Sequence, residues 1–218
     1  MSEKKERLVI GVSGASGVIY AIRLLEALRE VKHIETHLVI SNSAKQTVLL
    51  ETDFTVEHVE TLATRVYRFN DVAAAISSGS FKTRGMVVVP CSMKTLSSIA
   101  HSFGENLLSR AADVTLKEHR RLVLVPRETP LHLGHLRLLT TVAELGAIIV
   151  PPMPAFYHRP QTLDDIVNQT VNRVLDLLEI ELPRDLFKRW TGPQARQTAR
   201  ADGTQPSQTA EPFKIAQD

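Results

Sequence analysis

The sequence predicts an α/β protein with a doubly wound parallel sheet at its centre and helices on both faces, in three α/β/α layers. Short apolar runs alternate along the chain with stretches whose apolar residues recur at helical spacing, the pattern of parallel strands joined by crossover helices. The clearest run, GMVVVP at 85–90, is continuous and β-branched, as expected for a strand covered on both faces. The chain has 218 residues, 43% of them hydrophobic, enough to bury the core of one sizeable domain. We expect that single domain to span 7–182.

Each apolar run is expected to be a strand, and each periodic stretch a helix. The expected strands are 8–12, 36–41, 65–69, 85–90, 122–126 and 147–152. The expected helices are 18–29, 44–50, 93–118, 131–145 and 163–178. The last helix has Thr162 as its expected N-cap and Asp164 and Asp165 in its first turn, where acids are favoured. Residues 191–218 are polar and lack periodicity, so we expect a disordered tail there.

Charge and composition argue against several classes of function. A net charge of +2 gives no support for a nucleic-acid-binding surface or a membrane patch. No apolar run approaches the roughly 20 residues that a membrane-spanning helix needs, and the charged start MSEKKER is unlike a secretory signal. The one cysteine, Cys91, allows no intramolecular disulfide, which fits a reducing compartment. We therefore expect a cytoplasmic protein that binds neither nucleic acid nor membrane.

The first expected strand ends in a glycine-rich turn, GVSGASG at 11–17, which leads into the first helix. Glycines let backbone N–H groups approach a phosphate, and the following helix offers its positive end. The spacing G-x-x-G-x-x-G is not a dinucleotide fingerprint, and the second strand ends in ISNSA without an acid for a ribose, so NAD is disfavoured. The missing G-K-[ST] excludes P-loop chemistry. Ser16 either contacts a bound anion or caps the helix of a tight turn.

Polar residues also follow the second expected strand. Ser41 and Asn42 stand where the ribose-binding acid of a dinucleotide site would be. They can bond a phosphate or a ribityl hydroxyl, or Ser41 can cap the next helix. Glu51, near the end of that helix, is a candidate carboxylate for proton transfer, with a solvated helix-end glutamate as the alternative.

The segment PCSMKT at 90–95 follows the most apolar strand and opens the next helix with hydrogen-bond donors. Ser92, Lys94 and Thr95 at a helix N-terminus suit an anionic or polar ligand. Cys91 invites a role as nucleophile, but no triad pattern accompanies it. A small core residue is the favoured interpretation of Cys91.

The segment PRETP at 126–130 places a cation and an acid between two prolines directly after a strand. Arg127 can hold a phosphate with two parallel hydrogen bonds, and Glu128 can act as acid or base or orient the arginine. Arg110 and Lys117 lie upstream on an expected helix. These two either contribute to a phosphate pocket or belong to a solvated helix face.

The last loop, PPMPAFY at 151–157, ends in an aromatic hydroxyl. Tyr157 together with Arg173 on the following helix indicates a second phosphate-binding pair, with ordinary packing as the alternative. His132 and His135 are three residues apart, but no third ligand accompanies them, so we interpret them as surface or packing residues rather than a metal site.

Seven of these segments, taken in order, resemble the UbiX-type flavin prenyltransferase family, which includes the B subunits associated with aromatic-acid decarboxylases. The segments are GVSGASG, LVISNSA, SSGSF, PCSMKTL, SRAADVTLKE, LVLVPRETPL and PPMPAFY. The resemblance spans about 7–180. It implies a flavodoxin-like Rossmann fold and a homododecamer with active sites at subunit interfaces. It further implies metal-independent transfer of a dimethylallyl group from dimethylallyl phosphate to N5 and C6 of reduced FMN. The product, prenylated FMN, is the cofactor of UbiD-type decarboxylases.

The resemblance also assigns roles to residues at matching positions. Ser16 and Glu51 match residues implicated in proton movements around the flavin. Tyr157 and Arg173 match contacts to the prenyl phosphate. Further members of the phosphate pocket are matched by Lys117, Glu128 and Arg110, the last of which reaches a neighbouring subunit. The positions that match FMN contacts are Gly14, Ala15, Ser16, Ser41, Ser92, Met93, Lys94, Thr95 and Arg127.

Two other functions remain open from the sequence. One is direct decarboxylation of a hydroxybenzoate-type acid, and the other is a non-catalytic subunit that delivers FMN to a partner. The sequence also leaves open whether the downstream pathway is ubiquinone synthesis or decarboxylation of phenolic acids. It leaves open as well whether the donor is the phosphate or the pyrophosphate.

Overall fold

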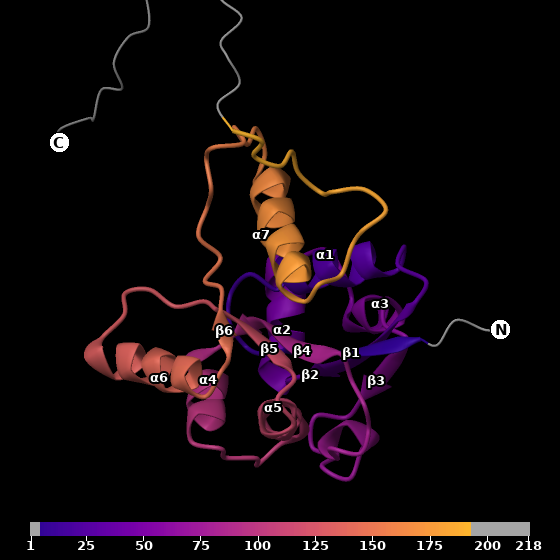
Figure 1. Ribbon diagram of the computed structural model, residues 1–218, viewed down its shortest axis with the longest axis vertical. Helices are drawn as coiled ribbons and strands as arrows, with labels where there is room; N and C mark the ends of the chain where they lie inside the picture. The colour runs from indigo at the N-terminus through magenta and orange to yellow at the C-terminus, as the bar shows by residue number, and fades with distance from the viewer. Residues whose placement is uncertain (1–4, 193–218) are drawn as a thin grey trace, which may run out of the picture.

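The computed structural model describes residues 5–192 and confirms the predicted doubly wound parallel sheet. Six strands of the described chain pair in parallel in the order β3-β2-β1-β4-β5-β6 (Figure 1), which is the Rossmann order. The strands are β1 (Glu6–Val12), β2 (Ile34–Ile40), β3 (Arg65–Tyr67), β4 (Gly85–Cys91), β5 (Arg121–Pro126) and β6 (Ile148–Ile149).

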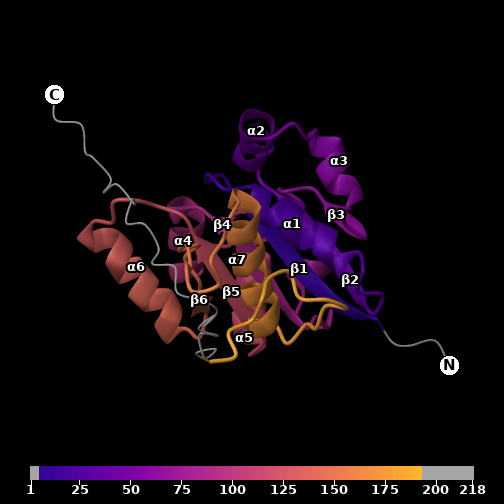
Figure 2. The same cartoon turned by 90° about the horizontal axis from the view of Figure 1, so that it is seen from above.

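Helices cover both faces of this sheet, as Figures 1 and 2 show from two directions. The layer on one face consists of α1 (Ile19–Leu28), α2 (Asn42–Glu51), α3 (Val56–Thr61) and α7 (Leu163–Leu177). The other layer consists of α4 (Met93–Ala100), α5 (Leu107–Lys117) and α6 (Leu133–Glu144), with the short 3-10 turn η1 (Ala75–Ser77) beside α5.

Alternate side chains of the central strands pack into the two layers. In β1, Leu8 and Ile10 join the core beneath α1 and α7, whereas Val9 joins the core beneath α4 and α5. The same alternation holds in β4 for Val87 and Val88. Because both faces are covered, the buried positions 8–12 of β1 and 85–91 of β4 are all apolar, which explains the continuous runs in the sequence.

The expected single helix at 93–118 is wrong, because the structure breaks it into α4 and α5. The chain turns at Ser102, whose φ is 52°, and Asn106 then caps α5 by accepting a hydrogen bond from the Ser109 N–H at 3.0 Å. A residue with positive φ ends a helix, and an asparagine N-cap starts the next one. Helix α3 and the turn η1 were not predicted either.

The last strand is shorter than the expected 147–152, and β6 ends before Pro151. Proline has no N–H to extend the ladder, which accounts for this end. The predicted N-cap Thr162 is confirmed, and it forms a capping box with Asp165. Most of the predicted tail, 193–218, lies outside the described residues. No helix in the described part is both long and apolar enough to cross a membrane.

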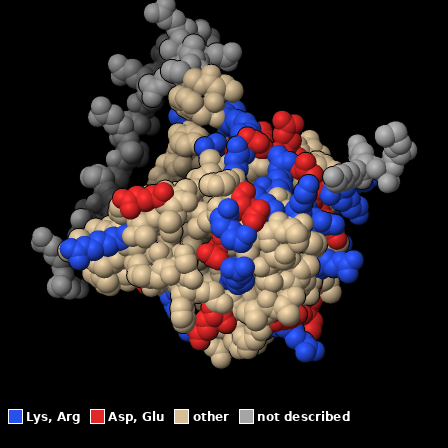
Figure 3. Space-filling view, turned by 60° about the horizontal axis from the view of Figure 1, so that its bottom comes forward, with Lys and Arg blue, Asp and Glu red and all other residues tan. Residues whose placement is uncertain are grey.

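Charged side chains of both signs are interspersed on the face shown in Figure 3. The part of that face toward α6 carries few charges, and α6 itself exposes Leu133, Leu136 and Leu145. Only Val142 of α6 is buried in the chain. Helix α6 and the residue that follows it therefore present exposed leucines among polar side chains such as Arg137 and Glu144.

Candidate active site at the carboxyl edge of the sheet

The switch point of the sheet lies between β1 and β4, and ligands of such sheets bind beyond the carboxyl ends of the strands at this point. The polar loops that follow β1, β2, β4 and β5 lie side by side there. Backbone hydrogen bonds join each loop to its neighbour. These run from Ser41 N–H to Val12 O (2.9 Å), from Ser13 N–H to Pro90 O (3.2 Å) and from Arg127 N–H to Cys91 O (3.1 Å).

Ser13 fastens the first loop to the loop after β4. Its hydroxyl donates to Pro90 O at 3.0 Å and accepts from the Ser92 N–H at 2.8 Å, and the side chain is buried. No sequence motif assigned Ser13 a role of its own. The only local signal was a hydroxyl directly after a strand, since its partners lie more than 75 residues away.

Gly14 and Gly17 are each required in the turn, but for different structural reasons. A Cβ on Gly14 would lie 2.3 Å from Ser43 Cβ, so the turn packs against the start of α2 without room for a side chain. Gly17 has a φ of +96°, a conformation that other residues rarely adopt. Between them, Ala15 is partly exposed and Ser16 is exposed at the tip of the turn.

Serines cap two of the helices that begin at this edge. The Ser41 hydroxyl accepts from the Ala44 N–H at 3.1 Å, so the capping alternative for Ser41 is realised in α2. Ser92 caps α4 by accepting from the Thr95 N–H at 3.3 Å, and its hydroxyl donates to Thr95 Oγ1 at 3.2 Å. Together with α1, these helices direct three positive N-terminal ends toward the switch point.

The N-cap residue of α1 makes no side-chain capping hydrogen bond. Glu51, at the end of α2, caps α1 instead. The Glu51 Oε2 atom accepts from the Gly17 N–H at 2.8 Å and from the Val18 N–H at 3.4 Å. Glu51 is therefore not a free helix-end glutamate. Its carboxylate lies at the turn that carries Ser16, so the two predicted proton-handling groups are brought to one turn.

Two cations at this edge have no acidic partner within ion-pair distance among residues 5–192. Lys94 is exposed in the first turn of α4, next to the partly exposed Met93, and Arg127 is exposed at the start of its loop. Burial raises the pKa of Tyr20 on α1, and the nearby Arg127 guanidinium partly opposes this rise. Arg127 therefore lies close to α1. Glu128 Oε1 accepts from the Thr129 N–H of its own loop at 2.9 Å.

Cys91 is fully buried beneath these loops, and burial raises the pKa of its thiol to about 12. A neutral thiol in an apolar setting is a poor nucleophile. The geometry therefore favours the interpretation of Cys91 as a small core residue.

Tyr157, in the loop before α7, contacts that helix one turn before Arg173. The Gln169 Nε2 donates to the Tyr157 hydroxyl at 3.2 Å, and Arg173 follows Gln169 by one helical turn. Arg173 Nη1 donates to Asp176 Oδ2 at 2.9 Å, and its side chain is 49% exposed. Arg173 therefore faces outward rather than belonging to the apolar face of α7. It lies about 15 Å along the helix from Leu163.

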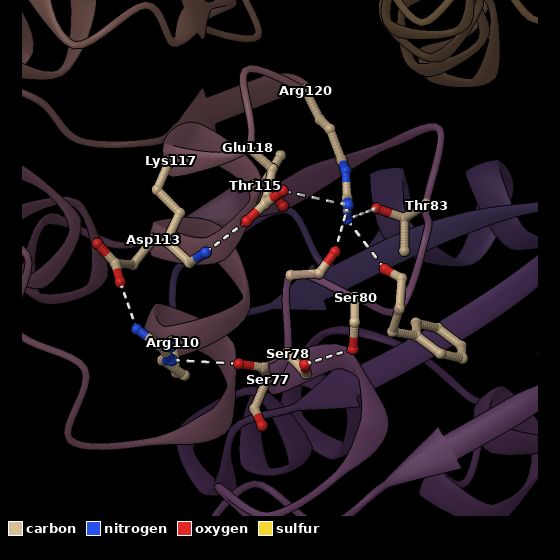
Figure 4. A network of polar contacts seen from close by, with 12 residues as sticks. Ser77, Ser78, Ser80, Thr83, Arg110, Asp113, Thr115, Lys117, Glu118 and Arg120 are labelled. Atoms are coloured by element: carbon tan, nitrogen blue, oxygen red, sulfur yellow. Dashed lines mark hydrogen bonds and ion pairs between the residues drawn. The ribbon is translucent and has the colours of Figure 1, made fainter.

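Arg110 and Lys117 share one face of α5. Figure 4 shows that Arg110 contacts the end of η1, where its Nε donates to Ser77 O at 3.3 Å. Lys117 pairs with Glu118 at the end of α5, only a few residues before β5 begins. Since β5 is parallel to β4, Lys117 lies at the amino edge of the sheet, opposite the polar loops.

The two histidines of the HLGH segment stack on each other, with ring centroids 3.6 Å apart. His132 caps α6, its Nδ1 accepting from the Gly134 N–H at 3.0 Å. No group of three or more potential metal ligands occurs among the residues that the structure describes. The stacking and the cap agree with the packing interpretation.

The edge thus combines a glycine turn, three helix N-termini and two cations without an acidic partner among the described residues. It also carries the exposed Ser16 on the turn that Glu51 caps, and the end of β2 has no acid for a ribose. These features define an α/β protein with a site for a phosphate-bearing mononucleotide. The Flavoprotein family model matches residues 1–175. Flavin prenyltransferase UbiX of Escherichia coli is 64% identical over 187 residues, which cover 86% of this chain and 99% of that protein. The chain belongs to the Flavoprotein family, among the flavin prenyltransferases.

Two solved structures agree with this assignment. The crystal structure of AnUbiX (PadA1) in complex with FMN and dimethylallyl pyrophosphate superposes with a TM-score of 0.83 at 48% identity, over 87% of this chain and all of that one. A structure described as a dodecameric FMN-dependent Ubix-like decarboxylase from Escherichia coli gives 0.82 at 50% identity, over 86% of this chain and all of that one.

Proposed function

We propose that this chain transfers a dimethylallyl group from dimethylallyl phosphate to N5 and C6 of reduced FMN, making the prenylated FMN that UbiD-type decarboxylases use. The observation that carries the proposal is the 64% identity to a flavin prenyltransferase along 99% of its length. The site at the carboxyl edge supports it independently, because it offers what an FMN phosphate and ribityl chain need.

Reduced FMN, when bound, supplies the nucleophilic N5 and C6 atoms of the reaction. The chain's part is to bind and orient it. The glycine turn lets its backbone N–H groups approach the ligand closely, and the N-terminal ends of α1, α2 and α4 favour the phosphate. Lys94 and Arg127 add charge that no described acid neutralises. The FMN-binding residues in this proposal are Gly14, Ala15, Ser16, Ser41, Ser92, Met93, Lys94, Thr95 and Arg127.

Ser16 and Glu51 handle protons next to the flavin. The Glu51 carboxylate is fixed by two backbone N–H groups of the turn that carries Ser16, and the exposed Ser16 hydroxyl can both donate and accept. A fixed carboxylate next to a free hydroxyl is a suitable pair for moving a proton over a short distance. Glu128 is the third acid–base group and belongs to the phosphate pocket.

The donor phosphate is bound by Tyr157, Arg173, Lys117 and Arg110. When the allylic C–O bond breaks, the phosphate leaves with the bonding electrons, and preorganised cations stabilise the charge that develops on it. Lys117 lies at the opposite edge of its own sheet, so it acts on the site of a neighbouring subunit. The exposed leucines of α6 support assembly into a homo-oligomer, for which we propose a dodecamer.

We assign the activity to the domain at 7–182 and propose that the protein is cytoplasmic. The support for this compartment is the single cysteine, which is buried and free and therefore compatible with a reducing environment.

Purified protein incubated anaerobically with reduced FMN and dimethylallyl phosphate tests the proposal. We expect a flavin product heavier than FMN by one dimethylallyl group replacing hydrogen, with a changed absorbance spectrum. Parallel reactions with dimethylallyl pyrophosphate and with 4-hydroxybenzoate distinguish the other candidates. Release of CO2 from the acid without any flavin product would favour direct decarboxylation, which the name of one structural relative suggests. Tight FMN binding without either reaction would favour an FMN-delivering subunit.

A further inference from the structure

One carboxylate near the end of α7 binds two arginines, and one of them is the proposed donor ligand Arg173. Arg173 Nη1 donates a single hydrogen bond to Asp176 Oδ2 at 2.9 Å. Arg189 donates to both oxygens of Asp176, at 2.9 Å to Oδ2 and at 2.8 Å to Oδ1. Arg189 therefore holds the bidentate position, the stronger of the two.

A second carboxylate keeps Arg189 in this position. Asp185 accepts from Arg189 Nε at 2.6 Å and from Nη2 at 2.7 Å. The hydrogen bond from Arg189 lowers the pKa of the Asp185 carboxyl, so Asp185 stays ionised at neutral pH. Arg189 thus bridges two acids, while Arg173 has most of its donors free.

The segment after α7 is folded back onto the elements that carry the proposed donor ligands. The Leu186 N–H donates to Asn172 Oδ1 on α7 at 2.8 Å. The Trp190 ring meets the Tyr157 ring edge-on, with centroids 6.2 Å apart. Arg189 is therefore held between Tyr157 and Arg173 by contacts on both sides.

We propose that Arg189 is a positioning residue for donor binding: it neutralises Asp176 and thereby leaves Arg173 free to bind the donor phosphate. The inference rests on the proposed function of Arg173. Arg173 exchanges its single bond with Asp176 for bonds to the phosphate, and Arg189 keeps the abandoned carboxylate paired. No covalent step is involved.

Competition between two anions for one guanidinium is the physical basis. Asp176 and the donor phosphate are both bidentate acceptors for Arg173. With Arg189 in place, Asp176 already has both oxygens occupied. Without Arg189, Asp176 would bind Arg173 in the bidentate geometry and compete with the donor phosphate. Arg173 is half exposed, so it has space to turn toward a ligand.

Donor affinity in a set of variants tests this mechanism. Titration of dimethylallyl phosphate into protein loaded with oxidised FMN reads the Kd without turnover. We expect Arg189→Ala to raise the Kd by about tenfold, within the range of coupling between contacting residues, and to leave the Kd of FMN unchanged. Arg189→Lys, which keeps the charge, should lie closer to the unaltered protein. Under steady-state conditions the change should appear in KM rather than kcat.

The decisive variant is the double change Arg189→Ala with Asp176→Asn. Our mechanism predicts recovered donor affinity, because the competing charge is gone, and Asp176→Asn alone should bind the donor at least as well as the unaltered protein. If Arg189 only anchors the segment, Asp176→Asn would weaken binding just as Arg189→Ala does, and the double variant would not recover. Either result overturns the proposal, as does an unchanged Kd in Arg189→Ala.

Two controls separate this inference from the proposed function. Arg23→Ala removes another arginine that holds α7, through Asn168 and Asp164, but it touches neither Asp176 nor Arg173, so the donor Kd should not change. In Arg173→Ala, which should itself bind the donor weakly, adding Arg189→Ala should have no further effect. Failure of the unaltered protein to bind donor or form product would instead reject the proposed function.

Discussion

The glycine turn at 11–17 and Lys117 at the end of α5 both belong to the proposed site, but they lie at opposite edges of the sheet. At the turn, one chain supplies nearly everything: Glu51 caps α1, and Ser13 fastens the turn to the loop after β4. On α5, Arg110 binds Ser77 O and Lys117 pairs with Glu118. In the site that we propose, the FMN part therefore comes from one chain, whereas the donor part would need Lys117 from a second copy.

This difference has a physical origin in the fold. Every strand of a parallel sheet ends at the same edge, so the loops after β1, β2, β4 and β5 must meet there. The end of α5 returns the chain to the other edge before β5 begins. Under the proposed function, Lys117 would reach a flavin only across a subunit interface, so we expect activity to depend on assembly.

Of the predicted changes, Glu51→Gln should have the largest effect, which is on the rate of prenylated-FMN formation. The amide oxygen can still accept from the Gly17 N–H, so the turn and FMN binding should persist. Loss of the carboxylate should slow formation of prenylated FMN by about 100- to 1,000-fold, as for removal of a general acid–base group. Glu57→Gln, an exposed glutamate of α3, is the matched control and should turn over normally. Equal rates for Glu51→Gln and the unaltered protein would remove Glu51 from the mechanism.

Gly14→Ala should weaken FMN binding through a steric clash in the glycine turn. The new Cβ would meet Ser43 Cβ at 2.3 Å, so the turn must move away from α2, and we expect FMN to bind about 30-fold more weakly, equivalent to about 2 kcal/mol. Fluorescence quenching of FMN on titration measures this. Gly104→Ala, where the nearest atom would be Arg110 Cδ at an ordinary 3.5 Å, should leave FMN affinity unchanged. A tight complex with Gly14→Ala would show that the turn is not a close contact of FMN.

Cys91→Ala should have the smallest effect on activity, because Cys91 packs beneath the loops and takes no part in the proposed reaction. With a thiol pKa of about 12, the thiolate fraction at pH 8 is about one in ten thousand. Iodoacetamide should therefore leave the folded protein unmodified at pH 8 and label it only after unfolding. Rapid labelling of the folded protein with loss of activity would restore a catalytic role for this cysteine.

Most of the fold could be predicted because parallel strands buried on both faces leave an unmistakable apolar pattern. The break at 101–106 could not be predicted from periodicity, since apolar residues recur at helical spacing on both sides of it. The turn is set instead by the positive φ of Ser102 and the cap at Asn106, and the sequence SFGEN contained these signals only as single residues.

The site was predictable as a set of loops but not as a set of contacts. Ser16 and Glu51 were both named, yet the bonds that bring them together join residues more than 30 positions apart. Asp176 and Arg189 carry no sequence signal beyond their charge, since their geometry depends on how the chain folds back after α7. Contacts between distant segments follow from packing, which a single sequence does not display.

Co-assembly of two inactive variants tests the shared site most directly. Glu51→Gln and Lys117→Ala subunits, carrying different affinity tags, are co-expressed and the mixed oligomer is purified through both tags. If the FMN loops of one chain work with α5 of another, about a quarter of the sites combine an intact Glu51 with an intact Lys117, given random assembly of a symmetric oligomer. We predict about that share of the unaltered activity. Glu51→Gln mixed with Gly14→Ala, whose two changes affect the same part of one chain, is the control and should show no such gain. Activity in the first mixture no higher than in its parents would contradict a site shared between subunits.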